Sequence, residues 1–312
     1  VLIYHNITPP EFFVDINKEL VRLCFRGRRE LALYKTRCDL ALGDSEYNRQ
    51  ELEALGFSPT GVLDVIPDFD HLCGPANYAL AGAFDDDWVN VLFVGRVIPN
   101  KKFEDIIRAF HAYKTFFNPH SRLLLVGAHS GFERYVSMLH RFIARLGARE
   151  VHLVGHVSNE ELTAYYELAD IFVCASEHEG FCVPLVESFH MGVPVVAYAA
   201  TAVPSTMDGA GILYTNKDPM FMAALINALV DDRQLADRIV DGQYAAVERL
   251  EAKDFAGTLL GHVDRVLAAP RQPHPAVAFD FWDQVDRAEE LDEIKAYRPS
   301  AFLALPPDPG ES

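Results

Sequence analysis

The sequence predicts an α/β fold with a parallel sheet, from three observations on residues 89 to about 215. Short apolar segments alternate there with longer segments of helical period. The apolar segments lack the in–out alternation of a strand with one wet face, which indicates burial on both faces. A helical segment separates most successive apolar segments, as in a parallel sheet covered by helices. Ligands of such sheets bind beyond the carboxyl ends of the strands.

Residues 1–72 contain a smaller set of elements of the same kind. Ser45 is expected to cap a helix, because its hydroxyl can accept a hydrogen bond from the first turn. Val1 stands inside an apolar run and is not a Met, so we expect further sequence upstream. The expected strands are Val1–Tyr4, Cys38–Leu42 and Val62–Ile66, and the expected helices are Leu20–Tyr34 and Ser45–Leu55.

Residues 73–88 are interpreted as a linker, because they hold glycines, a proline and the acidic run Asp85–Asp87. Residues 89–268 are expected to form one domain that becomes all-helical from residue 219. A proline-rich linker at 269–279, an amphipathic helix within 280–304 and a disordered tail from Pro306 should follow. The expected strands of the domain are Val89–Val94, Leu123–Val126, Val151–Val154, Ile171–Cys174, Val195–Tyr198 and Gly211–Tyr214, and the helices between them are Lys102–Phe117, Gly131–Leu146, Asn159–Leu168 and Val183–Met191.

The net charge and the cysteine content of the chain argue against several classes of function. The chain has 28 basic and 45 acidic residues, a formal net charge of −17, which argues against non-specific nucleic-acid binding. The 5 cysteines are an odd number without a CxxC pair, so we expect free thiols, no zinc site and a reducing, cytoplasmic location. No apolar run reaches the roughly 18 residues of a membrane span. A basic helix near residues 22–37 could still contact an anionic acceptor or membrane headgroups, although a solvated helix face is the better interpretation.

The segment after Ile171–Cys174 combines a glycine loop, a short helix and two acids. The N-terminus of a helix near Val183 directs free N–H groups and partial positive charge at the loop, which favours an anion. Glu179 lies in the loop and Glu187 on the helix, eight positions later. Carboxylates accept hydrogen bonds from hydroxyls. Phosphate and polyol groups on one ligand would therefore both find partners here, with Glu187 placed for a ribose and Glu179 for a second sugar.

A second candidate site follows the strand Val89–Val94. Gly95 leads into Arg96, Lys101 and Lys102 at the start of a helix. An arginine can hold phosphate oxygens with two parallel hydrogen bonds, and a lysine adds a mobile positive charge. A solvated basic loop would explain this segment equally well by itself. Because parallel strands end at the same edge, we expect these cations to lie beside the Glu179 loop.

Together the two segments resemble the signatures of the retaining, GT-B-fold glycosyltransferases of family 4. The family commonly has a small residue, often Gly, where this chain has Cys182. The second segment is similar to the family element Gly-Arg-x-x-Pro-x-Lys, with Lys101 in the last place. The first match is Glu179-Gly180-Phe181-Cys182-Val183-Pro184-Leu185-Val186-Glu187, followed by Gly192-Val193-Pro194-Val195-Val196.

The resemblance implies a two-domain protein that moves a hexose from a nucleotide-diphosphate sugar to an unidentified acceptor, without metal or other cofactor. Residues 1–72 would be a remnant of the N-terminal, acceptor-side domain, residues 89–268 the donor domain, and the helix within 280–304 would cross back onto the first domain. A nearly complete first domain is absent from this sequence. The implied catalytic residues are Glu179, Arg96, Lys101 and His5, and the implied donor-binding residues are Glu187, Gly180, Phe181, Cys182, Val183, Lys102 and Val157.

Several interpretations stay open at the level of sequence. His5 matches the family's donor-facing histidine loosely, and a loop histidine without such a role is as good a reading. Asp85–Asp87 contains a DxD pattern, but in a linker a solvated charge run is the better interpretation. His178 has no spaced partners for a metal. A nucleotide-sugar epimerase on the same fold and a non-catalytic nucleotide-sugar binding module are the alternative functions.

Overall fold

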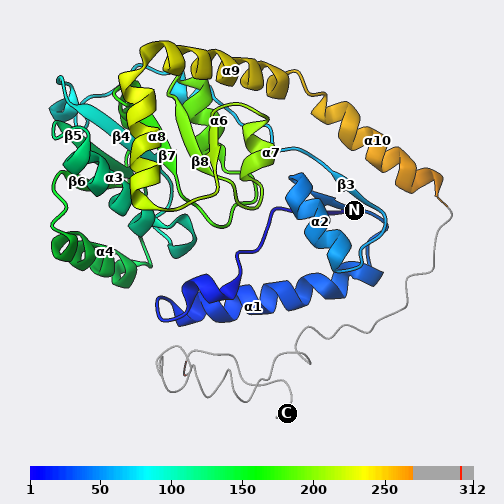
Figure 1. Ribbon diagram of the computed structural model, residues 1–312. Helices are drawn as coiled ribbons and strands as arrows, with labels where there is room; N and C mark the ends of the chain where they lie inside the picture. The colour runs from blue at the N-terminus through cyan, green and yellow to red at the C-terminus, as the bar shows by residue number, and fades with distance from the viewer. Residues whose placement is uncertain (270–302, 304–312) are drawn as a thin grey trace. The chain divides into compact units, whose positions relative to one another are not determined.

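The computed structural model describes residues 1–269 and Leu303 (Figure 1). Residues Val1–Pro270 form one compact unit with two parallel sheets. The helix expected within 280–304 lies outside the described residues, apart from Leu303. None of the helices in the described part is both long and apolar enough to cross a membrane.

The larger sheet has six parallel strands in the order β6-β5-β4-β7-β8-β9. Its topology reverses between β4 and β7, because the chain fills one half of the sheet before it returns to the centre. Open sheets of this order bind ligands in the crevice at that switch point. The strands are β4 (Val89–Val94), β5 (Ser121–Val126), β6 (Val151–Gly155), β7 (Ile171–Cys174), β8 (Val195–Tyr198) and β9 (Ile212–Tyr214).

The central strands are buried on both faces, as the uninterrupted apolar segments predict. Every residue of β5 and β7 is buried, and so are the four middle residues of β4. Helices cover both faces of the sheet, with α3 packed on α8 and α6 packed on α9 (Figure 1). These helices are α3 (Phe103–Phe116), α4 (Glu133–Leu146), α5 (Asn159–Glu167), α6 (Val183–His190), α7 (Val203–Met207), α8 (Pro219–Asp231) and α9 (Arg233–Glu251).

Local sequence signals set the helix ends. Ser158 and Glu161 form a reciprocal capping box at the start of α5, which satisfies two backbone N–H groups. Asp218 and Asp232 accept from first-turn N–H groups of α8 and α9. Gly147 ends α4 in the left-handed conformation, with φ of 68°. The expected helix boundaries are therefore confirmed to within about two residues.

The smaller sheet has three parallel strands in the order β1-β2-β3, at Leu2–Tyr4, Ala41–Gly43 and Thr60–Val62. The helices α1 (Lys18–Leu33) and α2 (Glu46–Ala54) lie between them in sequence, and Ser45 caps α2 as expected. The expected strand Val62–Ile66 is wrong, because the observed strand β3 lies earlier in the chain, over Thr60–Val62. Strand β2 ends at Gly43, where the chain turns into α2, so β3 finds backbone partners only over Thr60–Val62.

The last described helix, α10 (Phe255–Ala268), packs on the smaller sheet and not on the larger one. Leu40, Leu42 and Leu63 of the smaller sheet region contact its apolar side chains. The Nε2 atom of His262 on α10 lies 3.2 Å from the carbonyl oxygen of Val62. The chain therefore returns to its N-terminal part already at α10, before the segment for which we expected such a crossing.

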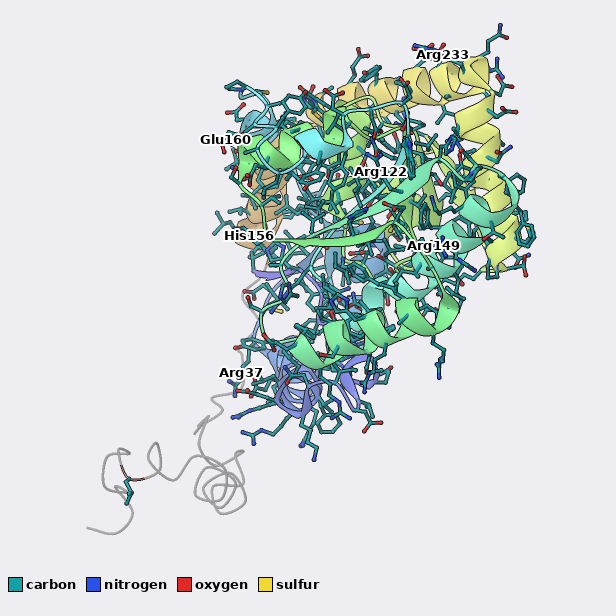
Figure 2. All side chains as sticks on the ribbon, turned by 90° about the vertical axis from the view of Figure 1, so that its left-hand side faces the viewer. Arg37, Arg122, Arg149, His156, Glu160 and Arg233 are labelled. Atoms are coloured by element: carbon teal, nitrogen blue, oxygen red, sulfur yellow. The ribbon has the colours of Figure 1, made fainter. Side chains whose placement is uncertain are left out.

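The acidic run before β4 is not simply solvated. Asp86 makes an ion pair of 2.6 Å with Arg122 of β5. Arg122 is labelled on its strand in Figure 2. The Arg122 guanidinium is the main cause of a lowered pKa of Asp86. The pair ties the segment before β4 to β5, so Asp86 has a structural partner.

Candidate active site

The two segments singled out in the sequence meet at the switch point. A 3-10 turn, Pro99–Lys101, follows β4, and a loop from Ala175 to Cys182 follows β7. The Nζ atom of Lys101 lies 2.5 and 2.7 Å from the two carboxylate oxygens of Glu179. Burial acts to lower the pKa of Lys101, but the Glu179 carboxylate outweighs it and the pKa is raised. Lys101 is therefore a half-buried cation, paired with a buried acid, at the carboxyl ends of the two central strands.

The structure separates the roles of the two consecutive lysines. Lys102 has a left-handed backbone, with φ of 52°, which turns its side chain away from Lys101. Its Nζ atom pairs with Glu177 at 2.9 Å and lies 5.6 Å from the ring centroid of Phe12. Because Lys102 does not share the Glu179 contact, Lys101 is the better placed cation for a ligand at the switch point.

Arg96 follows β4 directly and stands exposed at the same edge. Its guanidinium lies 5.0 Å from the ring centroid of Phe132 and donates to the carbonyl oxygen of Ser130 at 3.3 Å. Among the described residues no carboxylate forms an ion pair with it. The Phe132 ring orients Arg96 without using its charge, which leaves that charge for an anion.

Backbone packing explains the glycine at the end of β5. A Cβ atom on Gly127 would stand 2.0 Å from the carbonyl oxygen of Gly95, which is closer than any real contact. Gly127 therefore lets the loops after β4 and β5 lie against each other.

The loop from Gly180 to Val183 forms the N-terminus of α6. Cys182 takes the N-cap position with φ of 78° and ψ of 68°, a left-handed conformation in which glycine carries no steric cost. Phe181 is buried, and its carbonyl oxygen accepts a 2.5 Å hydrogen bond from Thr206. At the start of α6, Val183 has a backbone N–H, Pro184 has none, and the Leu185 N–H donates to the carbonyl oxygen of Cys182. The Val183 N–H and the positive end of the helix dipole suit an anion.

Glu187 is buried on α6, with both carboxylate oxygens in contact with other elements. The Tyr166 hydroxyl of α5 donates to one oxygen at 2.8 Å. The Nε2 atom of His71, between β3 and β4, lies 3.0 Å from the other. Burial, followed by the Glu187 charge, raises the pKa of Tyr166 well above its usual value, so the phenol stays protonated as the donor. Nothing in the sequence pattern pointed to Tyr166 or His71.

Residues from three other segments hold the Glu179 loop in place. The Glu179 N–H donates to Thr201 Oγ1 at 2.8 Å, and Thr201 follows β8. The side-chain amide of Asn100 donates to the backbone carbonyl oxygen of His178 at 3.0 Å. The backbone carbonyl oxygen of Asn100 accepts a hydrogen bond from the N–H of Glu177. Lys217 bonds the carbonyl of Ala175 at 2.9 Å and the Glu177 carboxylate at 2.9 Å. The position of Thr201 at a strand end was visible in the sequence, whereas the roles of Asn100 and Lys217 were not.

The N-terminal part contributes a polar chain that reaches the same loop. The Nε2 atom of His178 lies 2.6 Å from Asn6 Oδ1, and Asn6 donates to Asn48 at 2.7 Å. Asn48 donates in turn to Asp44, whose other oxygen lies 3.5 Å from Nδ1 of His5. The His5 side chain is exposed, but its backbone lies against Gly180. His5 therefore lies beside the loop. The polar chain through Asp44, Asn48 and Asn6 connects it to the buried His178 of that loop.

Val157 remains a prediction as a contact to a nucleobase. It follows β6, two strands from the switch point, and is half-buried against the core of the larger sheet. The other predicted residues, Lys101, Glu179 and the Gly180–Val183 segment, come together at the switch point, with Arg96 at the same edge.

The two parallel sheets, with a switch point in the larger one, have the GT-B fold that glycosyltransferases share. The chain belongs to the family described as glycosyl transferases group 1, whose sequence model matches residues 81–245. It is similar to the O-antigen chain mannosyltransferase B of Escherichia coli, with 31% identity over 208 residues, 62% of this chain and 52% of that protein. It also resembles the D-inositol 3-phosphate glycosyltransferase of Thermomonospora curvata, with 30% identity over 221 residues, 65% of this chain and 51% of that protein. The chain thus spans about half the length of these curated relatives.

Solved structures share the fold. HepE of Anabaena, in complex with UDP and glucose, superposes with a TM-score of 0.67 at 22% identity, over 86% of this chain and 71% of that one. The sucrose-phosphate synthase of Thermosynechococcus elongatus superposes with a TM-score of 0.66 at 22% identity, over 85% and 67% of the two chains.

Proposed function

We propose that this chain is the donor-binding part of a retaining hexosyltransferase that uses a nucleotide-diphosphate sugar. The contact between Lys101 and Glu179 carries the proposal, because it brings a cation after β4 and an acid after β7 together at the switch point. The resemblance to HepE, which was solved with UDP and glucose, supports a donor of this chemistry. The acceptor is an unidentified hydroxyl compound, and the location is cytoplasmic.

Each part of the donor has a partner of matching chemistry. The diphosphate would lie between Arg96, Lys101 and the N-terminus of α6, where N–H groups and cations favour negative charge. The ribose hydroxyls would bond to Glu187, which Tyr166 holds in place. The transferred sugar would bond to Glu179, and the diphosphate would then share the Lys101 ammonium with this acid.

The reaction would depend on stabilising the leaving group. The bond between the anomeric carbon and the diphosphate oxygen breaks, and the acceptor oxygen bonds to the same face of that carbon. The proton of the acceptor hydroxyl passes to the leaving phosphate. Lys101, Arg96 and the α6 N–H groups stabilise the negative charge that builds on the diphosphate. We propose that these fixed charges take the role that a divalent metal has in other transferases.

Calorimetric titration with UDP, GDP and ADP tests the donor site and identifies the base. We expect one nucleotide to bind, and Arg96→Ala and Glu187→Ala to weaken its binding at least about tenfold, since each removes about 1.5–3 kcal/mol of charged hydrogen bonding. Glu179→Ala should weaken only the sugar-bearing donor. Glu160→Ala, an exposed acid at the first turn of α5, is the matched control and should have no effect.

The products of the donor distinguish the remaining alternatives. Hydrolysis or transfer of the hexose with retained configuration supports the proposed reaction. Donor binding without turnover, also after extension of the chain to the length of its relatives, would instead establish a nucleotide-sugar binding module. Formation of an epimerised sugar nucleotide would show that the protein is a nucleotide-sugar epimerase. If no nucleotide binds to the extended, folded protein, the donor-site assignment is wrong.

A further inference from the structure

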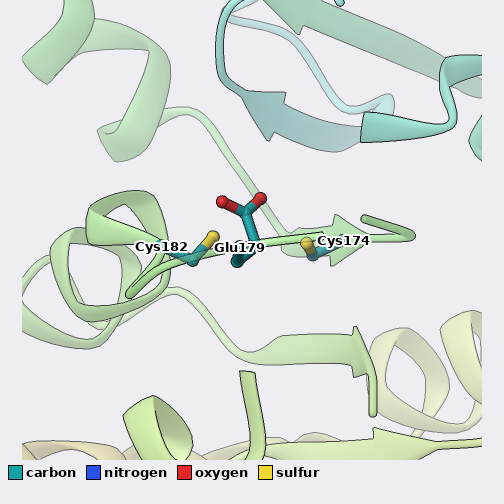
Figure 3. A group of neighbouring side chains, drawn as sticks. All are labelled: Cys174, Glu179 and Cys182. Atoms are coloured by element: carbon teal, nitrogen blue, oxygen red, sulfur yellow. The ribbon is translucent and has the colours of Figure 1, made fainter. Parts of the chain in front are cut away.

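Two cysteines converge on the proposed catalytic acid. Cys174 ends β7, Cys182 caps α6, and Glu179 lies in the loop between them. One ligand atom of each residue lies within 4.8 Å of the other two, and all three residues are buried. Figure 3 shows both sulfur atoms directed toward Glu179, whose carboxylate stands beside them.

The conformation of Cys182 makes this arrangement unusual. A non-glycine residue with φ of 78° carries a steric cost of roughly 1–2 kcal/mol, and glycine would avoid it. Cys182 nevertheless stands there, with its thiol in the protein interior near a second buried thiol. A side chain kept at a strained position next to a reactive site is a reason to look for a function of that side chain.

We propose that Cys174, Glu179 and Cys182 form a binding site for a thiophilic divalent cation of the zinc type, and that this cation inhibits transfer. Two thiolates and one carboxylate are a ligand set that zinc accepts, with a water or substrate oxygen in the fourth position. Zinc–sulfur bonds of about 2.3 Å place two sulfurs roughly 3.8 Å apart in a tetrahedral site. The observed separations fall within reach of that geometry.

The charges around the site favour a divalent cation over a bare pair of thiolates. Binding of the cation would release the protons of both thiols. The two thiolates, the Glu179 carboxylate and the Lys101 ammonium would then carry an excess of negative charge, which the divalent cation neutralises. Buried charge is tolerated only when it is compensated. The Lys101 ammonium contacts both oxygens of Glu179, and each oxygen has a second lone pair that can accept the cation.

The same contacts predict inhibition. A cation bonded to Glu179 would occupy the acceptor positions that the proposed function gives to the sugar hydroxyls. This consequence rests on the proposed function, whereas the cation site itself does not. A disulfide between Cys174 and Cys182 is the competing arrangement, but both cysteines are free thiols in the structure.

Cadmium titration of the reduced protein tests the site without any donor, because thiolate–cadmium bonds absorb in the ultraviolet. We expect one strongly bound ion per chain, displaced by zinc. Cys182→Gly, which suits the backbone at this position, and Cys174→Ala should each weaken binding at least about 100-fold, and Glu179→Gln about tenfold or more. Cys73→Ala, which removes an exposed cysteine, is the control and should bind as the wild type does.

The inhibition is measured separately, as zinc-dependent loss of donor hydrolysis or transfer that a chelator restores and that Cys182→Gly resists. The proposal is overturned if the reduced, folded protein binds no cadmium, or if Cys182→Gly binds it unchanged. It is also overturned if a low-molecular-weight disulfide oxidant links the two cysteines while neither metal binds. Cadmium binding in a protein that binds no nucleotide would keep the cation site and reject only the proposed function.

Discussion

Lys101 and Lys102 follow each other in the sequence, but their ammonium groups have different surroundings. The Lys101–Glu179 pair has side chains only 16% and 7% exposed, whereas the Lys102–Glu177 pair is 28% and 34% exposed. Removing one partner of a buried pair leaves an uncompensated charge. Solvent screens the more exposed pair.

We therefore expect Lys101→Ala to lower the free energy of unfolding by about 3 kcal/mol and Lys102→Ala by about 0.5 kcal/mol. Urea denaturation at neutral pH measures both values. Nucleotide affinity should follow the same ranking, because Lys101 is the cation at the switch point. Equal losses for the two variants would mean that the lysines are interchangeable and that the assignment is wrong.

The strain at Cys182 can be measured apart from the loss of its sulfur. Cys182→Gly and Cys182→Ala both remove the thiol, and they differ only in backbone preference. At φ of 78° we expect the Gly variant to be more stable than the Ala variant by roughly 1–2 kcal/mol. At Cys73, where φ is −82°, the order should reverse by about 0.5–1 kcal/mol. Urea denaturation measures the free energy of unfolding of the four variants. If the Ala variant at position 182 is more stable than the Gly variant, the backbone there is not strained.

The buried carboxyl of Asp44 predicts how the stability of the fold depends on pH. Burial raises its pKa above the usual value, although hydrogen bonds from Asn48 and the nearby His5 oppose the shift. The folded state then binds a proton at a higher pH than the unfolded state does, so lowering the pH favours folding at this group. We expect the wild type to gain stability relative to Asp44→Asn as the pH falls from 7 to about 4, the unperturbed range of an Asp. The exposed Asp85→Asn is the control, and an equal pH profile for Asp44→Asn and the wild type would contradict the prediction.

At the scale of elements, α5 and α6 are joined at the proposed ribose site by the bond between Tyr166 and Glu187. Tyr166→Phe keeps the ring in the core but leaves a buried carboxylate with one donor fewer. We expect a loss of about 1.5–3 kcal/mol in stability and weaker nucleotide binding. Tyr165→Phe, at the neighbouring buried position, should cost less than about 1 kcal/mol, because its hydroxyl does not bond Glu187. Unfolding curves and nucleotide titration of both variants check this, and equal effects would remove the special role of Tyr166.

At the scale of the whole described unit, Gly180 is one of the points where the N-terminal part touches the Glu179 loop. A Cβ atom there would stand 3.0 Å from both the Asn6 Cβ atom and the His5 carbonyl oxygen. We expect Gly180→Ala to move the His5–Asn6 segment and to cost about 1–3 kcal/mol. Gly242→Ala, in α9 with no atom near the added Cβ, should instead stabilise by about 0.5–1 kcal/mol. Denaturation and limited proteolysis of residues 1–10 test the pair, and unchanged protection in Gly180→Ala would contradict the contact.

The sequence by itself determined the α/β class, the six strands of the larger sheet and the segments that meet at its edge. This was possible because buried parallel strands read as unbroken apolar runs and because glycine loops mark their ends. The Glu179 loop and the Gly95–Lys102 segment were predicted to be neighbours, and the Lys101–Glu179 contact confirms it. The capping residue Ser45 acts within one helical turn, so its role was also predictable from the sequence.

Only the tertiary structure decided which of two adjacent lysines faces the acid, because a left-handed backbone at Lys102 has no sequence signal of its own. Tyr166 and His71 reach Glu187 from other elements, 21 and 116 positions away in the chain. The register of β3 depended on where β2 ends, and the convergence of Cys174 and Cys182 on Glu179 depended on the path of the loop. Local pattern fixes where a strand or helix forms, whereas side-chain contacts across elements depend on how the whole chain packs, and no local pattern records that packing.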